Sequence, residues 1–347
     1  MVKSLFDISW QVDEPTYRAD PALSQSTLTK FERDGFSCID KLGEKISTPA
    51  LTFGSAVDSI ITGGMDEFNS RFLVADIPTV EDSIKLLVTE AFNSYKDEYS
   101  HLSDIPVDAL VAITEEYKYQ PRWKPETRAR VILEKGEELY NMMFLAEDKT
   151  ILTTEQYEKI EACVNALRTS PATGHLFAEV SPFDQDFEKL YQLKFKCTHN
   201  DVDYRGMLDL TVIDHRNKTI YPYDLKTTGH PEHEFFKSFL KWGYQCQGRL
   251  YTRLIEENIK DDPYFKDFTV STFKFIVVNK DTLNPLVWDF TDNHALGDLC
   301  YGKKDDIILR DPYKVGEELH YYLTVKPKVP IGINEINNIK LWINKEL

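Results

Sequence analysis

The amino-acid sequence predicts an α/β (α+β) protein with a mixed central sheet flanked by helices. Residues 81–170 carry mainly the apolar spacing of helices, whereas β-rich runs begin at about residue 176. A helical segment at about 234–257 is followed by two further β-rich runs, at 269–279 and 283–291. Strands, then a helix, then more strands are typical of a sheet that carries helices on its faces.

Length and charge set the broad class of the protein. With 347 residues, of which 42% are hydrophobic, the chain can bury one large core or two small ones. Its 57 acidic and 41 basic residues give a net charge of −16, so the surface as a whole repels polyanions. Any nucleic-acid partner is therefore expected to bind at a local basic site.

Cysteine spacing and hydropathy exclude several further classes. The five cysteines lie far apart, so zinc, iron–sulphur and thioredoxin-type sites are not expected, and the thiols are interpreted as reduced. The N-terminus lacks the apolar core of a signal peptide, and no run approaches the ~20 apolar residues that cross a bilayer. We expect a soluble, cytoplasmic protein with no membrane partner.

Two helices are predicted near the N-terminus. Leu23–Asp34 has the apolar spacing of a helix, and Ser24 or Ser26 is a suitable N-cap. A second, short helix is predicted over Phe53–Ile61, because glycines follow it from Gly63 onward.

The chain is expected to divide by composition. We expect residues 1–80 to form an N-terminal helical part, 81–170 a helical insertion, 171–330 the core and 331–347 a tail. From 81 to 120 there are nine acidic and three basic residues, which makes a poor DNA-binding face. The insertion is interpreted as a solvated support for the core.

The most informative segment is YRGMLDLTVIDHRNKTIYPYDLKTT, residues 204–228. Two β-rich runs flank a polar turn, as a hairpin requires. If the turn is centred between residues 216 and 217, Asp209 lies opposite Asp224 and Leu210 pairs with Tyr223. Lys226 then shares a face with Asp224, because side chains two residues apart in a strand point the same way.

Two carboxylates and an ammonium gathered in this way suit a divalent cation. Like charges opposite each other destabilise a hairpin, and oxygen ligands favour Mg²⁺ or Mn²⁺ over zinc. A metal there would polarise a phosphodiester and activate water, while Lys226 orients or deprotonates that water. The alternative is a surface hairpin with an ordinary Asp–Lys ion pair, and a one-residue slip would separate the carboxylates.

A helical stripe follows the hairpin. Tyr244, Gln247, Tyr251 and Leu254 recur at intervals of three and four, so they share a helix face. Gln247 is placed to bind a phosphate or to position the charged cluster, and Tyr251 to stack or donate its hydroxyl; ordinary core packing is the alternative. From 226 to 253 five basic residues oppose two acidic ones, which is a local phosphate-binding pattern.

Together these segments resemble the PD-(D/E)XK nuclease superfamily, most closely its RecB/RecE-type exonucleases. The segments that carry the resemblance, in order, are LSQSTLTKF, LTFGSAVDSII, GMLDL, DLKTT and YQCQGRLY. The resemblance implies a restriction-endonuclease-like core with a helical insertion. It also implies a Mg²⁺-dependent (or Mn²⁺-dependent) exonuclease that hydrolyses phosphodiester bonds at DNA duplex ends, in phage-like recombination or repair.

The resemblance assigns roles to particular residues. It implies metal ligation by Asp209, Asp224 and the carbonyl of Leu225, with Lys226 as the catalytic lysine. Gln247 and Tyr251 match the Q-x-x-x-Y signature, which lies beside the active site in these relatives.

Two further metal ligands are expected with less direct support from the motifs. An upstream acidic ligand is expected, and Glu179 is chosen for it. Asp58 stands where these relatives commonly have a histidine. A carboxylate at that position suits Mg²⁺ as a ligand, or is simply a charge on the helix surface.

Partners and rival functions follow from the same comparison. Relatives of this kind act on double-stranded DNA ends, often form homo-oligomers and often work beside a single-strand annealing protein. Two rivals are a non-catalytic nuclease-fold binding protein and an acidic mimic of DNA, which the net charge of −16 favours. A structure- or sequence-specific endonuclease would use the same chemistry.

Overall fold

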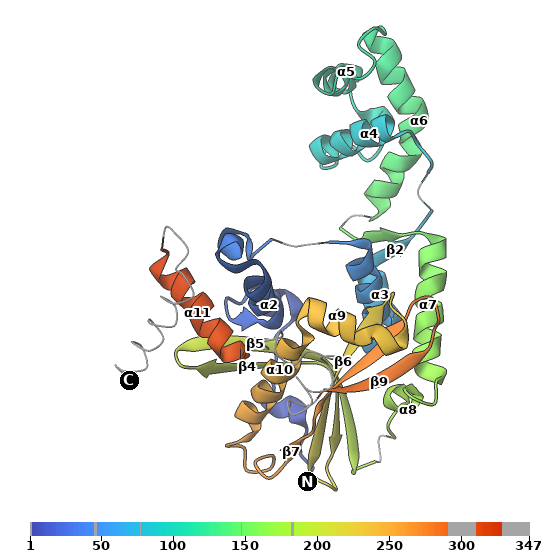
Figure 1. Cartoon of the computed structure of the whole chain (residues 1–347). Coiled ribbons are helices and arrows are strands. Elements are labelled where there is room, and N and C mark those ends of the chain that lie inside the picture. The colour runs from blue at the N-terminus through green and yellow to red at the C-terminus, as the bar shows by residue number, and fades with distance from the viewer. Residues whose placement is uncertain are drawn as a thin grey trace. The chain divides into compact units, whose positions relative to one another are not determined.

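The computed structural model describes residues 2–44, 47–76, 78–146, 148–181, 184–290 and 310–327. The chain divides into two compact units (Figure 1). Unit 1 comprises residues 1–62 and 162–347, and unit 2 runs from 63 to 161.

Unit 1 is built around a mixed sheet, as the sequence predicts. In the part of the chain that the structure describes, the sheet has seven strands: β1 (Leu23–Ser24), β4 (Phe187–His199), β5 (Val202–Asp214), β6 (Thr219–Thr228), β7 (Thr269–Val270), β8 (Phe273–Asn279) and β9 (Pro285–Phe290). The main order is β1-β5-β6-β8-β9, with β4 paired to β5 and β7 to β6. The β4, β5 and β6 strands form an antiparallel meander, whereas β6 and β8 run parallel. The fold class is therefore α/β with a mixed sheet.

Helices flank this sheet and close its core. They are α1 (Glu14–Ala19), α2 (Gln25–Asp34), α8 (Gly174–Phe177), α9 (Phe235–Trp242), α10 (Tyr244–Ile259) and α11 (Pro312–Val325), with short 3-10 turns at Leu5–Ile8, Gly35–Lys41 and Glu232–Glu234. Helix α10 lies against β4, β5 and β8 and also contacts α2, α9 and α11 (Figure 1). Its apolar stripe, with Leu250 and Leu254 fully buried, joins the main core.

Local signals explain the N-terminal helices. Ser24 caps α2 by accepting a hydrogen bond from the backbone N–H of Thr27, and Leu28 and Phe31 are buried, which confirms the predicted helix. Helix α3 (Pro49–Arg71) begins earlier than predicted. It is interrupted at the predicted glycines, because the backbone at Gly64 is not helical (φ 74°, ψ −168°), and a second helical segment follows.

Other sequence predictions are wrong in detail. The predicted strand at about 176–183 is not formed over residues 176–181, and residues 182 and 183 lie outside the described residues. Helix α8 ends at Phe177, and Lys189 Nζ donates hydrogen bonds to the carbonyls of His175 and Ala178. The predicted single helix at 234–257 is two helices, because Gly243 adopts a left-handed conformation (φ 65°, ψ 37°).

A further helix lies near the C-terminal end of the described chain. Helix α11 begins where Asp311 caps it by accepting from the N–H groups of Tyr313 and Lys314, and Pro312 occupies the first turn. The predicted helix at 295–308 and the predicted tail at 331–347 lie outside the described residues.

Unit 2 has its own small core. Helices α4 (Asp82–Tyr95), α5 (Val107–Glu116) and α6 (Pro125–Ala146) pack together, and a pair of parallel strands, β2 (Phe72–Val74) and β3 (Thr150–Leu152), accompanies them. Helix α7 (Thr154–Thr169) begins in unit 2 and ends in unit 1. The predicted insertion, 81–170, has different bounds from unit 2.

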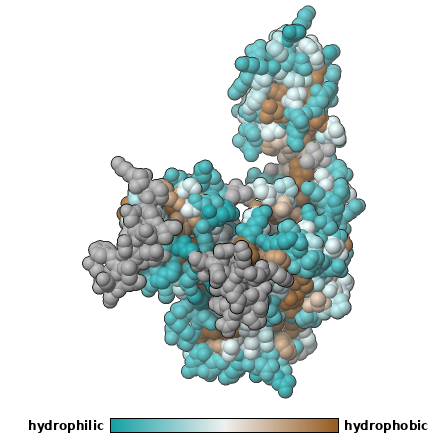
Figure 2. Space-filling view, in the orientation of Figure 1, coloured by the Kyte–Doolittle hydropathy of each residue, from teal (hydrophilic) through white to brown (hydrophobic). Residues whose placement is uncertain are grey.

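The surface of unit 2 is strongly acidic. Residues 63–161 contain 21 acidic and 11 basic residues. Hydrophilic side chains cover most of the face seen in Figure 2. Among the described residues, no helix has the length and apolar character needed to span a membrane.

The close approach of β5 to α10 depends on a glycine. A Cβ at Gly206 would lie 2.7 Å from the Tyr251 ring and from Leu254 Cδ1, both on α10. We expect Gly206→Ala to lower the free energy of unfolding by about 1–3 kcal/mol, because overpacking forces the helix away from the strand. Urea denaturation measures this change.

Gly43→Ala is the matched control, because a Cβ at Gly43 meets no atom within 4 Å. Equal stability of the two variants would contradict the close packing of α10 on β5.

Candidate functional site

The site begins where two neighbouring strands separate. The β5–β6 ladder has the predicted register but ends at the pair Leu210 and Tyr223, so the predicted pairing of Asp209 with Asp224 is not formed. Beyond that pair, β1 takes over beside β5, at Tyr204 and Arg205. Asp209 therefore lies between the part of β5 that pairs with β6 and the part that pairs with β1.

The side chain of Asp209 bonds to β6 just beyond the point where backbone pairing between β5 and β6 ends. Its Oδ2 accepts a hydrogen bond of 2.8 Å from the backbone N–H of Leu225 on β6. In an extended strand the N–H and C=O of one residue point to the same side, so the Leu225 carbonyl also faces β5. This brings a carboxylate and a carbonyl oxygen of the predicted ligand set to one place.

The electrostatic surroundings of Asp209 disfavour its charged form. Burial, together with the nearby carboxylates of Asp224 and Asp58, raises the pKa of Asp209 well above its usual range. Lys226 and the Leu225 N–H act in the opposite direction but do not cancel these effects.

Asp224 and Lys226 follow on β6 as a buried ion pair. Asp224 is only 3% exposed, and its Oδ2 contacts the Lys226 ammonium. The ammonium also lies 4.7 Å from the centre of the Tyr244 ring. Burial alone would lower the pKa of Lys226, but Asp224, Tyr244 and Asp209 outweigh burial and raise it, so the side chain stays charged.

Helix α10 supplies the second half of the cluster. Gln247 is buried, and its Nε2 donates a 2.5 Å hydrogen bond to Asp224 Oδ1. Its other amide atom, Oε1, is buried without a hydrogen-bond partner among the described residues. Gln247 therefore fixes one oxygen of Asp224 and leaves an acceptor beside it.

Tyr251 lies beside the cluster, and the carboxylates of Asp224 and Asp209 add to the effect of burial on the pKa of its hydroxyl. It is 7% exposed, packs against Gly206 and Phe273, and hydrogen-bonds the backbone of Met207. Burial raises the pKa of its hydroxyl well above the usual value. Its place in the structure supports α10 against the sheet.

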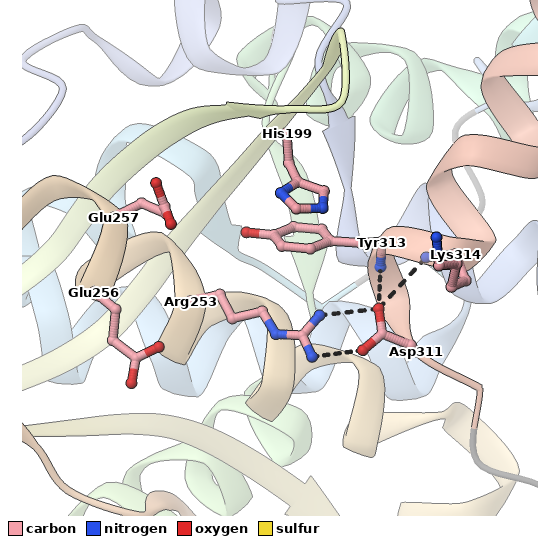
Figure 3. A pocket seen from close by; sticks show the side chains of 7 residues that line it. All are labelled: His199, Arg253, Glu256, Glu257, Asp311, Tyr313 and Lys314. Carbon is pink, nitrogen blue, oxygen red and sulfur yellow. Dashed lines mark hydrogen bonds and ion pairs between the residues drawn. The ribbon is translucent and has the colours of Figure 1, made fainter. Parts of the chain in front are cut away.

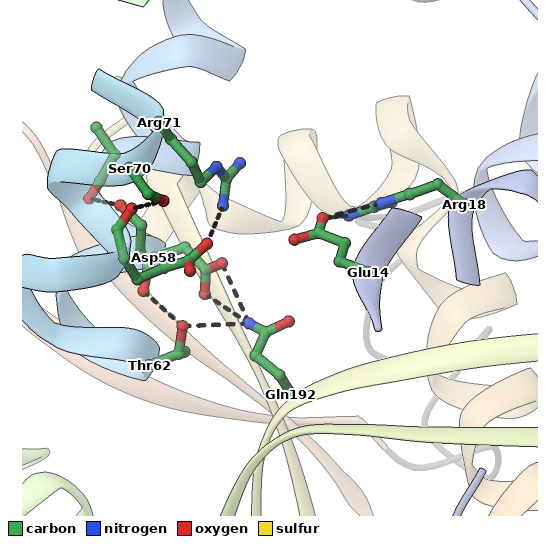
Figure 4. A network of polar contacts seen from close by, with 10 residues as sticks. Glu14, Arg18, Asp58, Thr62, Ser70, Arg71 and Gln192 are labelled. Carbon is green, nitrogen blue, oxygen red and sulfur yellow. Dashed lines mark hydrogen bonds and ion pairs between the residues drawn. The ribbon is translucent and has the colours of Figure 1, made fainter. Parts of the chain in front are cut away.

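Asp58 reaches the same neighbourhood from α3. Gln192 on β4 donates from Nε2 to Asp58 Oδ2 (3.2 Å) and to the Thr62 hydroxyl (3.3 Å), as Figure 4 shows. Asp58 is close enough to raise the pKa of Asp209, but its carboxylate is held by Gln192.

Glu179 is not brought to the site. It lies in the irregular segment after α8, where its side chain is exposed, and it is not among the groups that shift the pKa of Asp209. Glu179 lies on neither a strand nor a helix, although such a residue is expected on the element that precedes the hairpin.

Two contacts at the site are not predicted from the sequence: that of Gln192 with Asp58 and that of Tyr244 with Lys226. Gln192 has a positive φ of 52°, and the β4–β5 register skips it and Asp209 opposite it. No glycine or other local signal marks this distortion. Tyr244 belonged to the predicted stripe, but its contact with the Lys226 ammonium depends on tertiary packing.

The donor set fits a hard divalent cation only in part. Among the described residues, no group of three or more His, Cys, Asp or Glu side chains is arranged to hold a metal ion. However, burial and the carboxylates of Asp224 and Asp58 raise the pKa of Asp209, so the charged forms of these carboxylates oppose one another despite the Lys226 ammonium. Two carboxylates, the Leu225 carbonyl and water would suit Mg²⁺ or Mn²⁺, which keep several waters.

A separate pocket lies away from this cluster (Figure 3). It has a volume of about 440 Å³ and is lined by His199, Arg253, Glu256, Glu257, Asp311, Tyr313 and Lys314. None of these residues belongs to the predicted site. Arg253 is engaged with the Asp311 carboxylate, and Tyr313 is sandwiched between Arg253 and His199, so these groups satisfy one another.

The raised pKa of Asp209 predicts a pH-dependent stability in metal-free protein. The folded state binds the Asp209 proton more tightly than the unfolded chain, whose Asp pKa is about 3.9, so this residue destabilises the fold as pH rises between the two values. With EDTA at pH 7, Asp209→Asn should melt higher than wild type, about 2–4 °C per kcal/mol gained. This advantage should shrink as the pH is lowered toward 4.

Asp203→Asn is the control, since Asp203 is exposed on the same strand. An Asp209→Asn variant that melts at or below wild type at pH 7 would show that the carboxylate is not under repulsion.

Comparisons with known proteins are limited. No family model matches the chain, and no curated protein matches it. Among solved structures, the chain is similar to a crystal structure from Eubacterium rectale named “Putative exonuclease”, at 14% sequence identity and a TM-score of 0.45. The similarity covers 91% of this chain and 87% of that chain.

Proposed function

We propose that this protein is a metal-dependent nuclease that hydrolyses phosphodiester bonds in DNA, and that it acts as an exonuclease at duplex ends. The observation that carries the proposal is the cluster of Asp209, Asp224 and Lys226, in which two carboxylates of low exposure meet one ammonium. An excess of buried negative charge is costly to a fold unless a cation is bound there. The order of the motifs, GMLDL, DLKTT and Q-x-x-x-Y, supports the same function.

Each residue of the cluster has its own role in this proposal. Asp209, Asp224 and the Leu225 carbonyl would hold Mg²⁺ or Mn²⁺, with Asp58 acting directly or through water. A bound metal of this kind supplies Lewis acidity toward the scissile phosphate and lowers the pKa of a bound water. Gln247 keeps Asp224 in position by its hydrogen bond to Oδ1.

Lys226 acts as a charged donor. Because its pKa is raised, the side chain remains an ammonium, which orients the attacking water and stabilises the charge that develops on the phosphate. The Tyr244 ring and Asp224 restrict where that ammonium can lie. A role in recombination or repair, with a single-strand annealing partner and a homo-oligomer, follows from the motif resemblance and completes the proposal.

A binding protein that mimics DNA is the competing function, and the acidic surface of unit 2 is the observation in its favour. A mimic would need no divalent metal at the Asp209–Asp224 cluster. Metal binding and nuclease activity therefore separate the two functions.

Nuclease activity is the first test. With Mg²⁺ and linear duplex DNA, we expect wild type to release nucleotides, and Asp224→Asn and Lys226→Gln each to slow release by about 10²–10³-fold, because each removes electrostatic stabilisation of the transition state. Closed circular DNA should resist cleavage if the enzyme needs an end.

The control variant is Lys274→Gln, which breaks a cross-strand ion pair with Asp289 elsewhere in the same sheet. The proposal fails if Asp224→Asn and Lys226→Gln cleave DNA as fast as Lys274→Gln does.

Metal affinity is the second test. Calorimetry with Mn²⁺ should detect binding to wild type and to Asp203→Asn, but little binding to Asp209→Asn or Asp224→Asn, since each of the latter removes an anionic ligand. Equal heats for all four proteins would point to the mimic instead.

A further inference from the structure

An exposed basic and aromatic surface lies on the segment that connects β6 to α10. Trp242, the last residue of α9, is 46% exposed, and the ammonium of Lys241 lies 4.8 Å from the centre of its ring. Lys237 is exposed one helical turn earlier. We call Lys237, Lys241 and Trp242 the α9 platform.

The platform rests on a rigid base. Earlier in α9, Phe235 and Phe239 are fully buried and contact the Trp288 ring, with the Phe239 and Trp288 centroids 4.6 Å apart. Phe239 also meets Phe275 of the central sheet, at 5.8 Å. Trp242 is therefore an exposed side chain on a well-anchored helix.

The platform adjoins the candidate active site along the chain. Only Gly243 separates Trp242 from Tyr244, whose ring contacts the Lys226 ammonium. Two residues span at most about 8 Å between Cα atoms, so the backbone of Trp242 lies close to that of Tyr244.

Charge singles out this surface in an otherwise acidic protein. Lys237 is paired with Glu234, but Lys241 has no carboxylate partner in the described part of the chain. Its ammonium is thus available to a phosphate, in a protein whose net charge is −16. An aromatic face beside an unpaired cation is the combination that binds single-stranded nucleic acid, by base stacking and backbone attraction.

We propose that Trp242 and Lys241 bind single-stranded DNA, with one base stacked on the Trp242 ring and an adjacent phosphate on the Lys241 ammonium. A duplex is a poorer ligand, because its bases already stack on one another and leave no free face except at an end. The inference rests on the proposed nuclease function for its purpose: the platform guides an unpaired strand to the cluster at Lys226. Binding itself needs no catalysis and is measured separately.

The test is binding of a fluorescein-labelled oligothymidylate to the full chain, in EDTA so that no metal-dependent cleavage occurs. Trp242→Ala should weaken binding by about 5- to 150-fold, which corresponds to the 1–3 kcal/mol contributed by one stacked base. Trp242→Tyr should restore most of the affinity, because it keeps an aromatic face. Lys241→Gln should lower the slope of log Kd against log salt by about 0.7.

The matched control is Trp123→Ala. Trp123 is similarly exposed, at 42%, and has basic neighbours, but it belongs to the acidic unit 2. Binding should be unchanged by this substitution, and a duplex of the same length with blunt ends should bind wild type more weakly than the single strand.

The inference is overturned if Trp242→Ala binds the oligonucleotide as wild type does, or if Trp123→Ala weakens binding equally. Preference for the duplex would also overturn it. Loss of binding in Trp242→Ala together with absence of nuclease activity in wild type would uphold the platform and refute the proposed function. Unchanged binding in Trp242→Ala together with Mg²⁺-dependent cleavage by wild type would refute the platform and uphold the proposed function.

Discussion

The hydrogen bond from the Leu225 N–H to the Asp209 carboxylate is the interaction on which the site depends. It forms where β5 and β6 stop pairing, so that a side chain takes over the role of a backbone carbonyl. A carboxylate held there cannot turn away to solvent without leaving a strand N–H unsatisfied. The same separation of strands turns the Leu225 backbone toward Asp209. A structural requirement of the sheet thus fixes the position of a candidate ligand.

Charge is concentrated around that hydrogen bond at a cost to stability. Burial of Asp209, together with the nearby carboxylates of Asp224 and Asp58, raises the pKa of Asp209. Lys226 offsets part of this repulsion through Asp224, and Gln247 holds the other oxygen of the same carboxylate. Such a preorganised, partly frustrated cluster is what electrostatic catalysis needs, because the groups do not have to reorganise when charge develops. It also explains why a bound cation would stabilise the protein.

The break at Gly243 distributes function between two helices. After the break, α10 directs Tyr244 and Gln247 to the charged cluster and buries Tyr251 beside it. Before the break, α9 anchors itself through Phe235 and Phe239 and leaves Trp242 exposed. The left-handed Gly243 ends α9 and begins α10, so the two helices need not share one axis. The left-handed glycine therefore lies between the exposed Trp242 and the residues of α10 that contact the charged cluster.

The sequence by itself determined the local geometry of the site: the hairpin register, the shared face of Asp224 and Lys226, and the capped helix α2. Each follows from a short-range rule, because strand side chains alternate and turn and cap residues act over a few positions. Only the tertiary structure decided that Asp58 comes near Asp209 and that Gln192, with its positive φ, contacts Asp58. It also decided that Glu179 is exposed outside the cluster and that the Tyr244 ring contacts the Lys226 ammonium. The position of α8 also depends on tertiary contacts, because Lys189 on β4 donates hydrogen bonds to the carbonyls of His175 and Ala178. These contacts join residues far apart in the chain, so they depend on how helices pack on the sheet, which no local pattern records.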